Sequence, residues 1–310
     1  MSSHKLDESA SGVYIISATP FTENGEVDMD SADRLVDFYI EKGVSGITIL
    51  GMMGEAQKMA PEESESFLER IMKRVGSKIP VIVGVSNAGL DNLVHLSKVG
   101  VDKGAAGVMV APLAGLRTEE KVYNYFSQVF SALGDDIPVC YQDYPFATGT
   151  EISVTLFNRL VADFDQLVML KHEECPGLYK ISKVRQASDK GLRRVSILCG
   201  NGGLYLPQEL ARGADGAMTG FAYPEMLVTM VKLYKTGEHD RAEDVFDAYL
   251  PLVKHEQQPG FGLALRKEVL YRRGVISTPK VRAPGPKLNS IDQEELTRLI
   301  SRVEKNLEAL

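Results

Sequence analysis

Short apolar runs recur along the chain, separated by longer stretches in which apolar and polar positions alternate with a helical period. The runs are almost entirely apolar instead of alternating, which is typical of parallel strands buried on both faces. We therefore predict eight strands, at residues 13–19, 46–50, 80–85, 107–111, 138–142, 167–172, 195–199 and 216–219.

The stretches between these runs predict amphipathic helices. They lie at residues 31–41, 62–75, 90–103, 119–133, 153–161, 177–188, 205–212 and 224–236. A basic residue, Gly, two residues and a second Gly precede an apolar run three times, beginning at Lys42, Lys103 and Arg212. A basic last turn followed by Gly ends a helix, so this repeat marks helix-to-strand junctions. Eight strands, each followed by a helix, predict a (β/α)₈ barrel over residues 1–236.

The tail, residues 237–310, predicts three further helices with a proline-rich break at 278–286. No linker between independent domains is visible. Because (β/α)₈ barrels of about 250 residues form one domain, we expect the tail to pack on the barrel as part of a single structural unit.

Composition and charge exclude some classes of partner. The net charge of −7 and the isoelectric point near 5.4 argue against nucleic-acid binding. We find no apolar run as long as a membrane span and no apolar core of a signal peptide in residues 1–12, so we expect a cytoplasmic protein. The three cysteines fit no zinc spacing, and Cys140 and Cys199 are expected to be buried small hydrophobes.

Reactions in such barrels occur at the carboxyl ends of the strands, and the sixth strand ends in Lys171. Lysine is rarely buried, yet Lys171 follows the apolar run 167–170. A buried, neutral amine is suited to attack a carbonyl and form a Schiff base; the alternative is a lysine that reaches solvent. Strand alternation places Glu173 on the side of Lys171, as a candidate acid or base, and His172 on the other side.

Three other strand ends carry candidate binding residues. The turn Gly51-Met52-Met53-Gly54-Glu55 can point backbone amides at a carboxylate, or be a tight turn without a ligand. Tyr141 closes strand five, where it can relay protons or simply fill the barrel mouth. The loop Gly200-Asn201-Gly202-Gly203 can approach a ligand closely, or be a turn into the next helix.

Together, these strand ends resemble the dihydrodipicolinate synthase / N-acetylneuraminate lyase family over most of the chain. The family's marks are G-x-x-G-E after strand two, Tyr within Y-x-x-P-x-x-T-G after strand five, Lys at the end of strand six and a G-D/N loop after strand seven. Here they appear as Gly51–Glu55, Tyr141 with Pro145 and Thr148-Gly149, Lys171, and Gly200-Asn201.

The resemblance implies that Lys171 forms a Schiff base with pyruvate or a longer 2-oxo acid and that Tyr141 relays protons. It implies no metal or organic cofactor, and a homotetramer built as a dimer of dimers. The substrate-binding residues that we expect are Gly51, Met52, Met53, Thr19, Gly200, Asn201 and Thr219.

The chain departs from the family in its second-substrate half. No Tyr follows strand four, where residues 111–114 read Ala-Pro-Leu-Ala, and Phe146-Ala147 replace an Arg that binds the second substrate's carboxylate. One extra residue separates Tyr141 from Pro145. We therefore expect a rebuilt acceptor site in which Asp143, Glu173 and Asn201 serve, the first two as possible acids or bases.

The leading interpretation is thus a Schiff-base lyase, an aldolase or dehydratase, that acts on pyruvate or a longer 2-oxo acid. Dihydrodipicolinate synthase itself is the first alternative, and a non-catalytic barrel that binds a 2-oxo acid is the second. A metal-dependent aldolase needs clustered carboxylates and histidines. Of the five histidines, His172 alone lies near a predicted strand end, so we expect no metal site.

Overall fold

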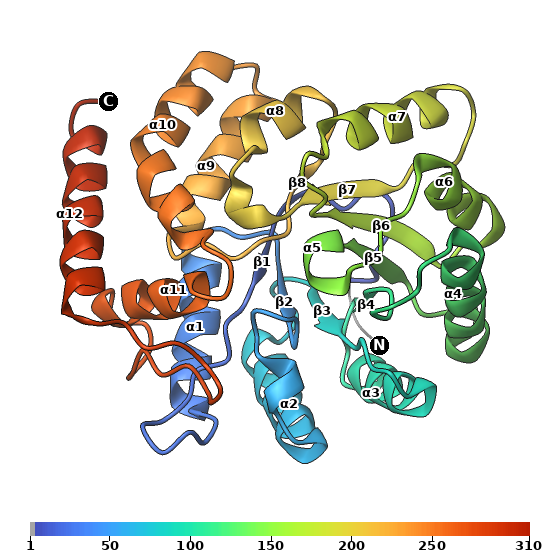
Figure 1. The fold of residues 1–310 in the computed structure, drawn as a ribbon, viewed down its shortest axis with the longest axis horizontal. Coiled ribbons are helices and arrows are strands. Elements are labelled where there is room, and N and C mark those ends of the chain that lie inside the picture. The colour runs from blue at the N-terminus through green and yellow to red at the C-terminus, as the bar shows by residue number, and fades with distance from the viewer. Residues whose placement is uncertain (1–3) are drawn as a thin grey trace.

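The computed structural model, which describes residues 4–310, is a closed barrel of eight parallel strands ringed by helices (Figure 1). Each strand pairs with the next along the chain, and β8 pairs with β1. The predicted (β/α)₈ barrel is confirmed. The strands are β1 (Gly12–Ile16), β2 (Gly46–Ile49), β3 (Val81–Gly84), β4 (Gly107–Val110), β5 (Val139–Asp143), β6 (Leu167–His172), β7 (Ser196–Cys199) and β8 (Gly216–Ala217).

The first strand ends earlier than the sequence predicts. Ser17 still donates its amide to Thr48 O, but regular pairing stops at Ile16. Pro20 has no amide hydrogen and cannot continue a ladder, so the chain leaves the sheet here and enters the loop above the barrel.

The barrel helices follow the predicted order, with one short addition, α5, after β5. They are α1 (Met29–Glu41), α2 (Pro61–Val75), α3 (Leu90–Asp102), α4 (Glu119–Leu133), α5 (Pro145–Thr148), α6 (Val154–Asp163), α7 (Leu178–Asp189), α8 (Leu206–Ala211) and α9 (Pro224–Lys235), with 3₁₀ turns η1 (Ala56–Lys58) and η2 (Asn201–Gly203). Gly43, Gly104 and Gly213 have φ of +77°, +95° and +94°. These left-handed conformations follow α1, α3 and α8 and confirm the predicted helix stops.

Two sets of apolar side chains pack against the barrel. The larger set joins the outer faces of the strands to the helices, and the smaller set fills the interior. Leu6 belongs to the inner set and donates its amide to Ala106 O, just before β4 begins. The interior is therefore covered at the amino end of the strands, and access to it lies at the carboxyl end.

The tail forms the three predicted helices, α10 (His239–Glu256), α11 (Gly262–Arg272) and α12 (Ser290–Leu307). In Figure 1 they stand together on one flank, where α10 contacts α9, α11 and α12. The segment between α11 and α12 returns to the barrel, where Ser277 donates its amide to Ser31 Oγ at 2.9 Å. Within residues 4–310, we find no helix long and apolar enough to cross a membrane.

Candidate active site

Lys171 lies inside the barrel near the carboxyl end of β6. The residue is only 4% exposed, and its neighbours in the sheet register are Gln142 of β5 and Leu198 of β7. Leu170, the residue before it, belongs to the outer set of apolar side chains. Strand alternation thus turns Lys171 inward, at the end of the barrel where reactions of this fold occur.

Glu173 pairs with Lys171. Its Oε1 lies 3.2 Å from Lys171 Nζ, and its Oε2 accepts a hydrogen bond of 2.8 Å from Gln142 Nε2. Gly200 leaves the room for this carboxylate, because a Cβ there would lie 2.2 Å from Glu173 Cγ. The predicted orientation of Glu173 is confirmed. We call Lys171, Glu173 and Gln142 the lysine cluster.

The turn after β2 presents backbone amides to the same end of the barrel. Among residues 4–310, no group accepts a hydrogen bond from the amides of Met52 and Met53. Thr19 Oγ1 donates to Gly54 O at 2.6 Å, so its hydroxyl holds the turn. Free, fixed amides favour an anion, and the predicted carboxylate pocket stays a prediction for this turn.

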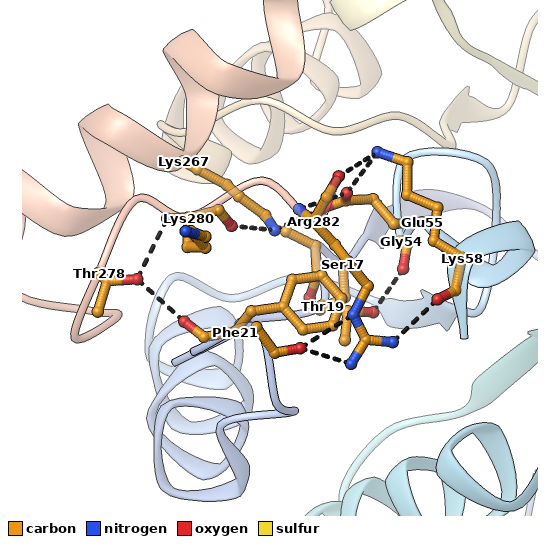
Figure 2. A network of polar contacts seen from close by, with 12 residues as sticks. Ser17, Thr19, Phe21, Gly54, Glu55, Lys58, Lys267, Thr278, Lys280 and Arg282 are labelled. Carbon is orange, nitrogen blue, oxygen red and sulfur yellow. Dashed lines mark hydrogen bonds and ion pairs between the residues drawn. The ribbon is translucent and has the colours of Figure 1, made fainter. Parts of the chain in front are cut away.

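Glu55, the acid of this turn, is held by the tail of the chain (Figure 2). It is buried, with a left-handed φ of 56°. Its oxygens lie 2.5 Å from Lys267 Nζ and 2.8 Å from Lys58 Nζ, and one accepts from the Arg282 amide at 3.0 Å. Burial lowers the pKa of Lys267 to about 8, which the charge of Glu55 partly offsets. This buried network fastens the turn to α11, and losing one partner would leave an unpaired charge.

Tyr141 does not face the site, which corrects its predicted role as a proton relay. Its ring lies on the outer side of β5, with ring centroids 4.7 Å from Phe126 and 6.0 Å from Phe157. Its hydroxyl is buried without a partner among the described residues, and burial raises the pKa of Tyr141 well above its usual range.

Gln142 takes the inward position instead, and the sequence contained the signal for it. In the spacing Y-x-x-P, the position three residues before Pro145 is Gln142, one residue after Tyr141. Because side chains alternate along a strand, a shift of one residue moves a side chain to the opposite face. The extra residue before Pro145 therefore moves the inward position of the motif from Tyr141 to Gln142.

Tyr141→Phe is expected to leave kcat within about twofold of the wild-type value and the melting temperature unchanged or higher. The change removes a buried hydroxyl without a hydrogen-bond partner in residues 4–310 and keeps the ring between Phe126 and Phe157. Steady-state kinetics and thermal unfolding check this. A tenfold or greater loss of kcat with the fold intact would restore the proton-relay role.

Asp143 also points outward, which corrects its predicted role as an acid or base of the acceptor site. Its Oδ2 lies 2.7 Å from Lys180 Nζ and 3.8 Å from His172 Nδ1, and Lys180 also pairs with Glu174. Asp143 and His172 are adjacent in the register of β5 and β6, so both belong to the outward rows. The expected orientation of His172 is confirmed, and Asp143 belongs to a buried cluster between β6 and α7.

Glu209 of α8 lies near this cluster and forms no ion pair with the residues that the structure describes. It is 4% exposed, and its Oε2 has no partner within residues 4–310. Burial raises the pKa of Glu209 from 4.5 to about 7, partly offset by His172 and Cys199. The folded chain thus binds a proton that the unfolded chain releases, so stability falls as pH rises from about 4.5 to about 7.

Glu209→Gln is therefore expected to raise the free energy of unfolding at pH 8 by up to about 3 kcal/mol. Below pH 4.5, the Glu209 carboxyl becomes neutral in the unfolded chain as well as in the folded chain. The gain should therefore shrink toward zero as the pH falls through this range. Urea unfolding of both proteins across this range measures the difference. A gain that does not depend on pH would mean that packing, and not the charge of Glu209, causes it.

The loops after β7 and β8 hold each other above the lysine cluster. Gly202 donates its amide to Thr219 Oγ1 at 2.7 Å, and Asn201 Nδ2 donates to Glu173 O at 3.1 Å. The hydroxyls of Thr219 and Thr19 therefore both form hydrogen bonds that stabilise the loops. Asn201 and Gly200 border the lysine cluster, and their contact with substrate remains a prediction.

Two further residues lie around this rim and had no signal in the sequence motifs. Burial raises the pKa of Tyr144, the charge of Glu173 raises it further, and the charge of Arg266 lowers it. The Tyr144 phenol is thus within electrostatic reach of both. Arg266 belongs to α11, which follows the last helix of the barrel. Its position at the rim is set by the packing of α11 on the barrel and not by a local sequence pattern. Within residues 4–310, no three His, Cys, Asp or Glu side chains gather as a group able to hold a metal ion.

Comparisons with known proteins span nearly the whole chain. A model of the dihydrodipicolinate synthetase family matches residues 9–303. L-2-keto-3-deoxyarabonate dehydratase of Azospirillum brasilense is 28% identical over 297 residues, 94% of each chain. A 4-hydroxy-tetrahydrodipicolinate synthase of Persephonella marina is 28% identical over 295 residues, 93% of this chain and 97% of that one. The crystal structure of a dihydrodipicolinate synthase from Rhodopseudomonas palustris is 47% identical, with a TM-score of 0.95 over 97% of this chain and 100% of that chain.

Proposed function

The chain belongs to the dihydrodipicolinate synthetase family, and on that basis we propose that it is a lyase that binds a 2-oxo acid as a Schiff base on Lys171. The observation that carries the proposal is the lysine cluster, in which a buried amine lies 3.2 Å from a carboxylate at the carboxyl end of the barrel. Within this class we propose a dehydratase of a 3-deoxy-2-oxo acid.

The first step joins the substrate to Lys171. The free amides of Met52 and Met53 hold its carboxylate, which directs C2 toward the amine. Glu173 accepts one proton from the ammonium group, and the neutral Nζ attacks C2. A second proton passes from the nitrogen to the C2 oxygen, Glu173 returns the first, and the oxygen leaves as water. The product is a protonated imine, which withdraws electrons from the bond at C3.

The second step uses the same carboxylate, which Gln142 keeps in place at 2.8 Å. Glu173 removes a proton from C3, and the electron pair forms an enamine. The enamine then expels the C4 hydroxyl, which takes the proton from Glu173 and leaves as water. Hydrolysis of the imine releases the product and restores Lys171.

Dihydrodipicolinate synthase activity is the second candidate, because the similar Rhodopseudomonas palustris protein has that name. Three features oppose it. The inward position of β5 carries Gln142, and a neutral amide is not a proton relay. No Tyr follows β4, where residues 111–114 are Ala-Pro-Leu-Ala, and no Arg follows Tyr144 before Thr148.

Mass spectrometry of the products separates the candidates. We expect L-2-keto-3-deoxyarabonate or a related 3-deoxy-2-oxo acid to give a product lighter by one water. Release of pyruvate from the same substrate would indicate an aldolase. Consumption of pyruvate only with aspartate semialdehyde would indicate the synthase, and borohydride trapping of a 2-oxo acid without turnover would indicate a binding protein.

The proposal also covers the assembly of the chain and its location in the cell, and both rest on the family resemblance. We propose a homotetramer in the cytoplasm, with residues 1–236 and 237–310 folding as one unit. Light scattering coupled to size exclusion measures the assembly, cell fractionation the location, and a single thermal transition the unit. A monomer, a membrane-associated protein or two separate transitions would contradict the respective part.

A further inference from the structure

The tail of the chain delivers a buried guanidinium to the rim of the barrel. Arg266 of α11 is 7% exposed, and its Nε donates to Glu256 Oε2 at 2.9 Å. Glu256, the last residue of α10, is itself buried. Lys267, the next residue on α11, fastens the turn after β2 through Glu55 (Figure 2). Arg266 is therefore fixed at both the helix and the side chain.

The guanidinium lies at the loops that follow β2 and β8, and it reaches the loop after β7 through Gln257. Nη1 lies 2.6 Å from Met53 Sδ in the turn after β2. A Cβ at Gly220, beyond β8, would lie 3.1 Å from Nη1. In the orientation that satisfies both ends of the Gln257 amide, its oxygen accepts from Nη2 and from the Gly202 amide, 3.3 Å each.

This guanidinium retains unused hydrogen-bonding capacity. Arginine has five N–H donors, and a thioether is a weak acceptor. Within residues 4–310, Glu256, the Met53 thioether and Gln257 take one donor each, so two of the five donors of Arg266 remain for a ligand. Buried polar groups normally have partners, and a buried guanidinium suits carboxylate and hydroxyl oxygens.

A chain of contacts connects Arg266 to the reacting end of the site. Glu173 pairs with Lys171 and accepts, at its backbone oxygen, from Asn201. Asn201 O in turn accepts from the Gln257 amide, which bonds Arg266. Arg266 thus lies at the far end of the loop after β7, and its charge reaches the phenol of Tyr144, which also experiences Glu173.

We propose that Arg266 binds the terminal oxygen group, a hydroxyl or a carboxylate, of a 2-oxo acid longer than pyruvate. The inference rests on the proposed Schiff base at Lys171. With the substrate carboxylate on the turn amides and C2 on Lys171, the tail of the substrate extends along the loop after β7 toward Arg266. Glu256 is the positioning residue for the guanidinium, and Arg266 selects substrates by length and by the polarity of their far end.

Borohydride trapping at graded concentrations tests the proposal without requiring turnover. Pyruvate, 2-oxobutyrate, 2-oxoglutarate and L-2-keto-3-deoxyarabonate serve as probes with no tail, an apolar tail, a carboxylate tail and a hydroxyl tail. In Arg266→Met, half-maximal trapping of at least one oxygen-tailed acid should need roughly 10- to 100-fold more substrate. Pyruvate and 2-oxobutyrate should stay within about twofold. Which acid is affected identifies the group that Arg266 binds.

The controls separate a binding role from a structural one. Arg272→Met makes the same change on α11 at a side chain that pairs with Glu268, and it should change no probe. The double variant Glu256→Gln, Arg266→Met avoids an unpaired buried carboxylate and should reproduce the selective loss if the single variant is unstable. Equal weakening of all four probes, or of none, in folded variants overturns the inference. Failure of the wild-type chain to trap any probe overturns the Schiff-base proposal instead.

Discussion

Lys171→Ala is expected to abolish turnover, with kcat reduced on the order of 10⁴-fold or more, and to prevent any borohydride adduct. The amine is the atom that bonds C2, and nothing else in the lysine cluster can replace it, because Glu173 and Gln142 carry no amine. Without the nucleophile, the covalent intermediate cannot form at all. The expected loss of kcat is therefore larger than the loss from removing an acid or a base.

The measurement is intact mass after incubation with pyruvate and borohydride. The wild-type chain should gain one pyruvate-derived adduct, and Lys171→Ala should gain none. Lys190→Ala, an exposed lysine just beyond α7, is the matched control and should be trapped like the wild type. An adduct on Lys171→Ala would move the Schiff base to another amine and would remove the basis of the proposed function.

Much of the fold was predictable because its signals are local. Apolar runs of a strand's length and glycines such as Gly43 and Gly104 at helix ends report on adjacent residues. Lys171 was predictable for the same reason, since an apolar run leads directly to it. Glu173 followed from the alternation of side chains over two residues, which the ion pair confirms.

The remainder of the site depends on information that is not local. Tyr141 and Gln142 are neighbours, and the choice between them depends on the face of β5 that turns inward, a property of the closed barrel. Arg266 and Lys267 reach the rim only because α11 returns to the barrel after the last strand. No pattern around them in sequence reports that contact.

Glu173→Gln is expected to lower kcat by roughly 10²- to 10⁴-fold while pyruvate is still trapped, more slowly, on Lys171. The substitution keeps the shape and can keep the hydrogen bond from Gln142, but an amide cannot take or return a proton. Schiff-base formation can reach equilibrium with a proton carried by water, whereas removal of a C3 proton from a bound intermediate needs a base in place. Turnover should therefore suffer far more than the final extent of trapping.

Stopped-assay kinetics with the best 3-deoxy-2-oxo acid, alongside trapping to completion with pyruvate, measure these two effects separately. Glu174→Gln is the matched control, because Glu174 is the next residue, pairs with Lys180 and lies on the other side of β6 from Lys171. It should keep kcat within about twofold. A Glu173→Gln variant with nearly full turnover would assign the proton transfers to another group, with the Tyr144 phenol the first to test. A variant that is never trapped would show that Schiff-base formation itself requires Glu173, and its loss of turnover would then not report on the step at C3.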